Sequence, residues 1–181
     1  EPDVRRIAAG APRDARVARI LASTLVARGD IERELTKHAS AESLFAEAVA
    51  AWQRVRELDP ASTAAAHQLS LATVKLGDAK AKRGDRAGAR VLYERALAID
   101  EAASGQSPDD VMLMSNLFWS YLRLAGLPDA TSTDRTVLRR RAIECAGRMM
   151  SMAPGDWRTR QADVYARRAR LFERHEAGER E

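Results

Sequence analysis

Residues that could perform metal or nucleophilic chemistry are few in this chain and lie far apart. The three histidines, His38, His67 and His175, have no cysteine, carboxylate or second histidine at the spacing of metal ligands. Cys145 is the only cysteine, and its apolar surroundings in the sequence predict a buried and unreactive thiol. We therefore expect no metal site and no nucleophilic cysteine.

Glycines and aspartates also give no sign of a cofactor or an acid–base pair. Gly77, Gly84 and Gly88 lack the following Lys-Ser or Lys-Thr pair of a phosphate-binding loop. The adjacent Asp109 and Asp110 directly precede an apolar segment, where an aspartate is more often a helix cap than a catalytic group. The sequence thus predicts a protein that is not an enzyme and holds no cofactor.

The composition is that of a folded chain. Its 181 residues are 45% hydrophobic and 31% charged, which excludes the disordered and collagen-like classes. No segment approaches the roughly 20 consecutive apolar residues of a membrane span. A single cysteine fits a reducing compartment, so we expect a cytoplasmic location and no membrane partner. The chain begins at Glu1 with no targeting segment, and we expect it to be a piece of a larger protein.

Positive charge is concentrated in the last quarter of the sequence. The segment 134–181 holds twelve arginines and eight acidic side chains, whereas the rest of the chain holds equal numbers of basic and acidic side chains. Two interpretations remain open: the arginines form a solvated helical face, or they bind an acidic partner such as nucleic acid. The net charge of +4 is small for a nucleic-acid-binding protein, and no aromatic-rich RNA-binding motif is present.

The elements that position these residues are predicted to be helices throughout. Apolar residues recur at intervals of three and four, and alanine, leucine, arginine and glutamate dominate. Caps and turn formers divide the chain into seven helices. The expected caps are Ser40, Asp109 or Asp110, Asp134 and Asp156, and the expected breaks are Gly29-Asp30, Asp59-Pro60, Gly84-Asp85, Gly126 and Pro154-Gly155.

The third and fourth helices carry a specific pattern of small and large residues. Small residues let two helices approach closely, larger ones fill the space between neighbouring pairs, and a turn glycine tolerates a left-handed backbone. The pattern consists of Leu76, Gly77, Gly84, Ala89, Tyr93 and Ala96. It resembles the tetratricopeptide repeat, although Lys80 stands where that family has a tyrosine.

Two weaker copies flank this pair, so the resemblance covers residues 15–154. The upstream copy ends at Pro60 and has about fourteen extra residues between its halves, centred on 31–43, and the downstream copy ends at Pro154. The resemblance implies an all-α fold, a right-handed α-solenoid of about three helix pairs at 15–60, 66–101 and 111–154. A capping helix over 156–174, a lead-in segment over 1–14 and a frayed tail over 175–181 complete the expected organisation.

The resemblance also implies a non-catalytic scaffold for protein–protein interaction, similar to repeats of bacterial multidomain signalling proteins. Such repeats bind a peptide or partner protein in a concave groove lined by the first helices, and basic residues here favour an acidic partner. Trp119 is either an apolar anchor in that groove or part of the core. The groove positions are Arg16, Arg19, Ser23, Leu71, Val74, Lys75, Asp78, Lys82, Met112, Ser115, Asn116, Trp119, Arg123, Arg160, Asp163 and Arg167.

Three alternatives remain open beside the scaffold. The arginine-rich C-terminal helices could bind nucleic acid or another anionic surface. A second copy of the chain could bury Phe118 and Phe172. An all-helical enzyme subunit would require a bound metal or cofactor, for which the sequence shows no ligands.

Overall fold

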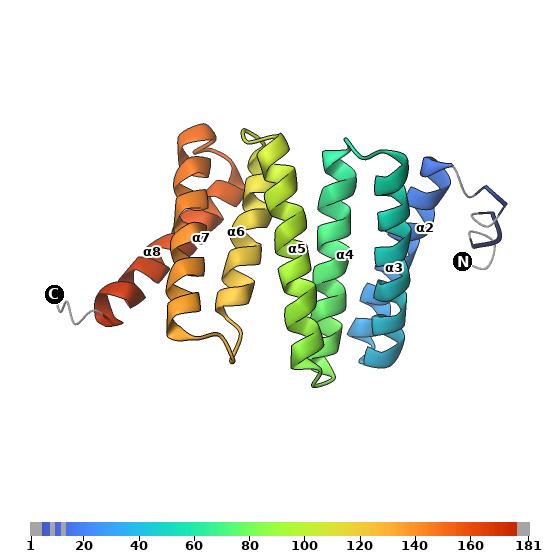
Figure 1. The fold of residues 1–181 in the computed structure, drawn as a ribbon, viewed down its shortest axis with the longest axis horizontal. Coiled ribbons are helices and arrows are strands. Elements are labelled where there is room, and N and C mark those ends of the chain that lie inside the picture. Colours follow the sequence, from blue (N-terminus) through green and yellow to red (C-terminus); the bar gives the residue numbers. More distant parts are fainter. Residues whose placement is uncertain (1–4, 8–9, 12–13, 177–181) are drawn as a thin grey trace. The chain divides into compact units, whose positions relative to one another are not determined.

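The computed structural model describes residues 5–7, 10–11 and 14–176, and every regular element within those ranges is an α-helix. The all-α class predicted from the sequence is confirmed. No described helix has the length and apolar character that crossing a bilayer requires. The helices (Figure 1) are α2 (Ala15–Glu34), α3 (His38–Leu58), α4 (Thr63–Lys82), α5 (Arg86–Gln106), α6 (Val111–Ala125), α7 (Ser132–Met152) and α8 (Trp157–Glu176).

The first helices of successive pairs begin at a fixed interval along the chain. α2, α4 and α6 begin at Ala15, Thr63 and Val111, which are evenly spaced, and α3 and α5 begin the same distance apart in sequence. We call this spacing the pair interval. The residue before each first helix caps it: Asp14, Ser62 and Asp110 each accept a hydrogen bond from a backbone N–H at 2.8–3.2 Å. The helix starts and their caps therefore repeat with the pair interval.

The chain divides into two compact units, residues 1–99 (unit 1) and 100–181 (unit 2), and the division falls within α5. In unit 1, consecutive helices lie antiparallel and are joined by short connections (Figure 1). Their many alanines allow close helix packing. The core consists of Ala22, Leu25, Ala41, Leu44, Phe45, Ala48, Val49, Trp52, Val55, Ala65, Leu69, Ala72, Leu76 and Ala79.

Two glycines lie inside first helices where an aromatic ring of the second helix leaves no room for a side chain. A Cβ on Gly77 would lie 2.6 Å from the Tyr93 ring, and a Cβ on Gly29 would lie 2.6 Å from the Phe45 ring. Gly29 and Gly77 are one pair interval apart, as are Phe45 and Tyr93, so the two contacts are equivalent. The other expected packing residues are buried as well: Leu76, Ala89 and Ala96.

The expected end of the first helix at Gly29-Asp30 is wrong. α2 continues through Gly29 to Glu34 and α3 begins at His38, so most of the residues expected as an insertion, 31–43, lie within these two helices. A glycine inside a helix costs about 1 kcal/mol relative to alanine, which is why the sequence suggests a helix end there. The Phe45 ring is the reason that a glycine is nevertheless required.

Two predicted caps are corrected by the structure. α3 begins before Ser40, at His38, and no side chain caps it. Thr131, not Asp134, caps α7: Thr131 Oγ1 accepts from the Asp134 N–H at 3.0 Å. Asp134 is the third residue of the helix and accepts from the Thr131 N–H at 3.2 Å. This reciprocal capping box satisfies two backbone donors at once, which a single cap at Asp134 would not do.

The connections after α2 and α4 each contain a residue with a left-handed backbone. Gly84 has a φ of 88°, as expected for a turn glycine, and Thr36, one pair interval earlier, has a φ of 60°. Thr36 therefore occupies the position that glycine occupies in the next pair. Pro60 and Pro154 lie in the connections that follow α3 and α7.

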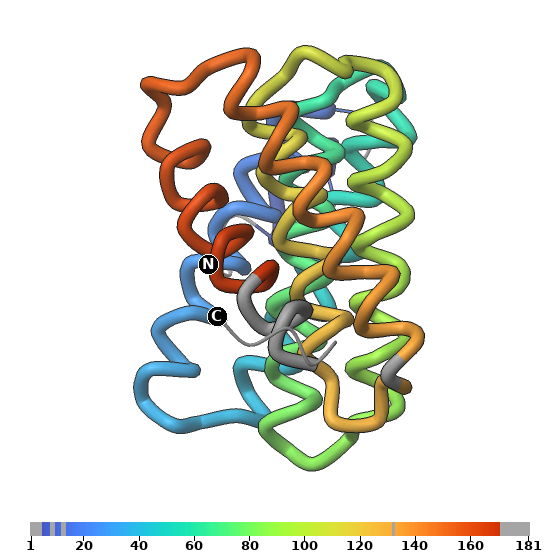
Figure 2. Tube along the Cα trace, turned by 90° about the vertical axis from the view of Figure 1, so that its left-hand side faces the viewer, coloured from blue at the N-terminus to red at the C-terminus, as the bar shows by residue number. Residues whose placement is uncertain are grey.

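In unit 2, α6 packs against α7, and α8 packs against both (Figure 2). Asp100 is 2% exposed and accepts a hydrogen bond from Ser120 at 2.6 Å, which satisfies a buried carboxylate. Asp156 caps α8, as predicted, by accepting from a backbone N–H at 2.7 Å. Phe118 is fully buried, so it does not need a second copy to cover it, whereas the side chain of Phe172 lies outside the described residues.

Candidate partner-binding surfaces

Lys75 on α4 is held against α2. Its Nζ lies 2.6 Å from Asp30 Oδ1 and 2.9 Å from Asp30 Oδ2, and Asp30 also pairs with Arg33 at 3.1 Å. The Lys75 side chain is 17% exposed, and its ammonium lies 5.9 Å from the centre of the Phe45 ring. Lys75 therefore links α2 and α4 through an ion pair. Its assignment to a binding groove had implied a side chain that projects freely.

The other groove positions of unit 1 include exposed side chains on α2 and α4. Arg19 pairs with Asp59 at 3.2 Å, Ser23 is exposed, and Leu71 is 38% exposed. Ser23 and Leu71 are one pair interval apart, so they occupy equivalent positions on their two helices. Leu71 therefore presents an apolar side chain on the face where a partner was expected.

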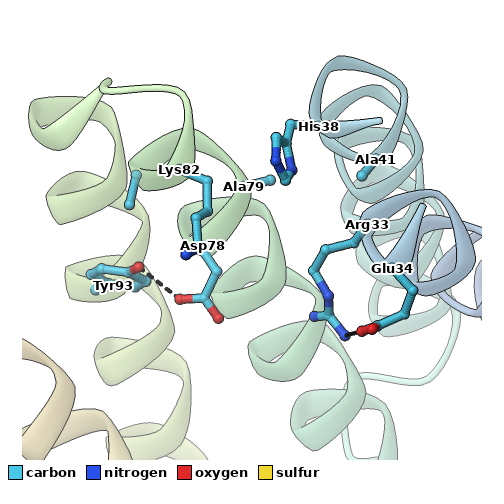
Figure 3. A pocket seen from close by; sticks show the side chains of 9 residues that line it. Arg33, Glu34, His38, Ala41, Asp78, Ala79, Lys82 and Tyr93 are labelled. Atoms are coloured by element: carbon cyan, nitrogen blue, oxygen red, sulfur yellow. Dashed lines mark hydrogen bonds and ion pairs between the residues drawn. The ribbon is translucent and has the colours of Figure 1, made fainter. Parts of the chain in front are cut away.

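A pocket of about 630 Å³ opens where α2, α3, α4 and α5 meet (Figure 3). Figure 3 shows Arg33 and His38 on the side of α2 and α3, and Asp78 and Lys82 on α4. The structure therefore brings two of the expected groove residues, Asp78 and Lys82, together with charged residues from the α2–α3 corner. The lining consists of Arg33, Glu34, His38, Ala41, Asp78, Ala79, Ala81, Lys82 and Tyr93.

The acidic and basic groups of this pocket differ in their partners. The Tyr93 hydroxyl donates to Asp78 at 2.7 Å, and Arg33 donates to Glu34 at 3.4 Å. Lys82 Nζ and the His38 ring make no hydrogen bond or ion pair within the part of the chain that the structure describes. An ammonium only donates, and an imidazole always carries at least one N–H, so the unpaired polar groups offer hydrogen-bond donors to a ligand.

A charged network ties α3 to the end of α4. Glu42 pairs with Arg83 at 2.7 Å and with Lys80 at 3.3 Å, and Lys80 also pairs with Asp85 at 2.9 Å. The hydrogen bond from Arg83 outweighs burial and, together with Lys80, lowers the pKa of Glu42. Hydrogen bonds to Asp85 and Glu42 raise the pKa of Lys80. Lys80 thus supplies an ionic tie between α3 and the end of α4.

Trp119 on α6 is half-buried in an aromatic row. Its ring meets the rings of Phe118 and Tyr165 edge-on, each with centroids 5.0 Å apart. Trp119 therefore packs against α8 while part of its surface stays accessible, and its role as an anchor for a partner stays a prediction. Ser115, expected in the groove, is buried and faces the core instead. The other α6 groove positions of the sequence analysis are partly exposed: Met112, Asn116 and Arg123.

The net charge of the two units differs from what the arginine-rich segment 134–181 alone suggests. Within 100–181, basic and acidic side chains are equal in number, so the net charge of +4 belongs to unit 1. Arg167 pairs with Asp163 at 2.7 Å, and Arg148 donates to a backbone carbonyl at 3.2 Å. Arg160 is exposed. These contacts favour the interpretation of the C-terminal arginines as a solvated helical face.

Cys145 is buried, as predicted, and burial raises the pKa of its thiol to about 11. Such a thiol stays protonated at neutral pH and is a poor nucleophile. Among the residues that the structure describes, no group of three histidine, cysteine, aspartate or glutamate side chains is placed to hold a metal ion.

Three ionisable residues of the pocket, Arg33, Glu34 and His38, were not predicted from the sequence. Arg33 and Glu34 fell in the insertion expected after an early end of the first helix, and His38 has no metal-ligand partner at a suitable spacing. The signal that could have found them is the recurrence of a Gly-Asp pair, at Gly29 and at Gly77, after one pair interval, which sets the register of α2 against α4.

No protein-family model matches the chain, and no curated protein is significantly similar to it. The class that the structure defines is therefore an all-α protein with periodic helix starts and an open, charged pocket, and its function is argued from those surfaces.

Proposed function

We propose that the chain is a non-catalytic interaction scaffold of tetratricopeptide-like helix pairs. Its partner is a protein or peptide that binds the exposed faces of α2 and α4. The tetratricopeptide interpretation is supported by the two equivalent contacts, Gly29 with Phe45 and Gly77 with Tyr93, because they place a small residue and an aromatic at matching helix crossings.

The observation that carries the proposal is the pocket where α2, α3, α4 and α5 meet. Lys82 and His38 offer unpaired donors there, and Leu71, which does not line the pocket, exposes an apolar side chain further along α4. A mixture of an accessible apolar side chain and convergent polar groups is the usual composition of a peptide-binding surface.

Site-specific photocrosslinking tests this proposal. A photoreactive amino acid at position 71 lies on the proposed face, and the same residue at position 91 replaces Val91, which is 63% exposed on α5. We expect partner adducts from position 71 in cells of the source organism and none above background from position 91. Equal adducts from both positions, or adducts from position 91 alone, would contradict the proposed binding face.

A further inference from the structure

We propose that the pocket where α2, α3, α4 and α5 meet receives an acidic side chain of the partner, with its carboxylate bound by Lys82 and His38. This inference rests on the proposed scaffold function, since it assumes that a partner binds the first helices. It adds the chemical class of the recognised group and the residues that recognise it.

The hydrogen-bond donors and acceptors of the pocket are not balanced. Both carboxylates, Glu34 and Asp78, already accept hydrogen bonds from neighbours. The Lys82 ammonium and the His38 ring have no such partner within the described residues. An incoming carboxylate would supply the missing acceptors, and charge-assisted hydrogen bonds of this kind are about twice as strong as neutral ones.

The acidic and apolar residues of the pocket favour a carboxylate ligand over a phosphate. Glu34 and Asp78 lie in the same pocket as the donors, so a doubly charged phosphate would meet more repulsion than a singly charged carboxylate. The apolar part of the lining includes Ala41, Ala79 and Ala81, which can contact the aliphatic stem of a glutamate. A glutamate or aspartate side chain therefore fits the pocket better than a phosphoryl group.

The unit that contains the pocket has a positive net charge. Residues 1–99 carry the whole excess of +4. A positive unit attracts an acidic segment over distances up to about the Debye length of 8–10 Å, so the field and the pocket favour the same ligand.

The test is an NMR titration of the full chain with short peptides that have blocked ends. One peptide places glutamate pairs among alanine and leucine, and a matched peptide has glutamine in their place. We expect the glutamate peptide to shift the backbone signals around His38 and Lys82, and the glutamine peptide to bind about tenfold more weakly.

Two charge-reversed variants complete the test. Lys82→Glu should weaken binding of the glutamate peptide about tenfold, whereas Arg86→Glu should change it less than about twofold, because Arg86 is exposed and does not line the pocket. Lys82→Gln is the milder variant if Lys82→Glu loses helicity. Two further peptides test other anionic groups. One has a free C-terminal carboxylate but no acidic side chain, and the other carries a phosphoserine.

Each result decides the inference. Shifts confined to other surfaces, equal affinity of the glutamate and glutamine peptides, or preference for the phosphoserine or free-carboxylate peptide would overturn it. Those results leave the scaffold proposal standing if position 71 still crosslinks to a partner. Loss of crosslinking at position 71, with intact binding of the glutamate peptide in the pocket, would count against the scaffold alone.

Discussion

Thr36 and Gly84 hold the same place in successive helix pairs, and both have a left-handed backbone. A left-handed conformation costs an L-residue about 1–2 kcal/mol, and a β-branched side chain tolerates it poorly. Glycine pays no such penalty, although it loses more conformational freedom on folding. The turn after α2 is therefore the strained copy of the turn after α4.

Exchanging these residue types should change stability in opposite directions. We expect Thr36→Gly to raise the free energy of unfolding by about 0.5–1 kcal/mol, because relief of strain exceeds the entropic cost of the added glycine. Gly84→Thr should lower it by about 1 kcal/mol or more. Urea denaturation of both variants measures the two changes, and a loss of stability in Thr36→Gly would show that the turn is not strained.

At the scale of the helical element, a glycine can be required by a neighbouring helix. A methyl group on Gly77 would meet the Tyr93 ring at 2.6 Å, and that ring is fixed by burial and by its hydrogen bond to Asp78. Gly147 lies in α7 with nothing within 4 Å of the corresponding position. The same substitution therefore tests helix packing at one site and intrinsic helix propensity at the other.

We expect Gly77→Ala to destabilise the protein by about 1–3 kcal/mol, because overpacking outweighs the better helix propensity of alanine. Gly147→Ala should stabilise it by up to about 1 kcal/mol. Thermal unfolding followed by circular dichroism compares the two. If Gly77→Ala melts at or above the temperature of the unmodified protein, then the Tyr93 ring does not exclude a side chain at position 77.

The charged network between α3 and α4 should make stability depend on pH. The pKa of Glu42 is lowered in the folded state, so its contribution is present above the pKa of the unfolded chain and is lost as the pH falls through the folded pKa. We expect Glu42→Gln to be less stable than the unmodified protein at pH 6 by less than about 1 kcal/mol. The difference should shrink as the pH falls below the usual glutamate pKa of about 4.3 and towards the lowered pKa of the folded state.

Glu94→Gln is the matched control, since Glu94 makes an exposed pair with Arg90 within one helix. Denaturant titrations from about pH 3 to about pH 7 supply the comparison. If the free energy of unfolding of Glu42→Gln changes with pH in the same way as that of the unmodified protein, then the network does not contribute to the pH dependence of stability.

At the scale of the whole molecule, the sequence predicted what local patterns determine. Helices followed from the spacing of apolar residues. A cap at Asp109 or Asp110 and one at Asp156 followed from their position before apolar segments, and the structure selects Asp110. The end of α2 did not follow, because glycine inside a helix and glycine after a helix look alike in a local window. Only the distant Phe45 decides between them.

The pocket was harder to predict for the same reason. Asp78 and Lys82 were expected on the binding surface from the family resemblance, and they line the pocket. His38 and Arg33 join them through the antiparallel packing of helices that are far apart in sequence. Isolated charges carry no local signal of this kind, since their meeting depends on the register between helices.

The length of the first helices sets a limit on what a partner can reach. α2 and α4 each have 20 residues, which corresponds to a rod of about 30 Å. A fully extended chain covers about 3.3 Å per residue, so roughly nine residues of a ligand lying parallel to such a rod would span it from end to end. A binding motif much shorter than about nine residues would contact only part of the helix, and the rest of the helix could contact a second segment of the same partner.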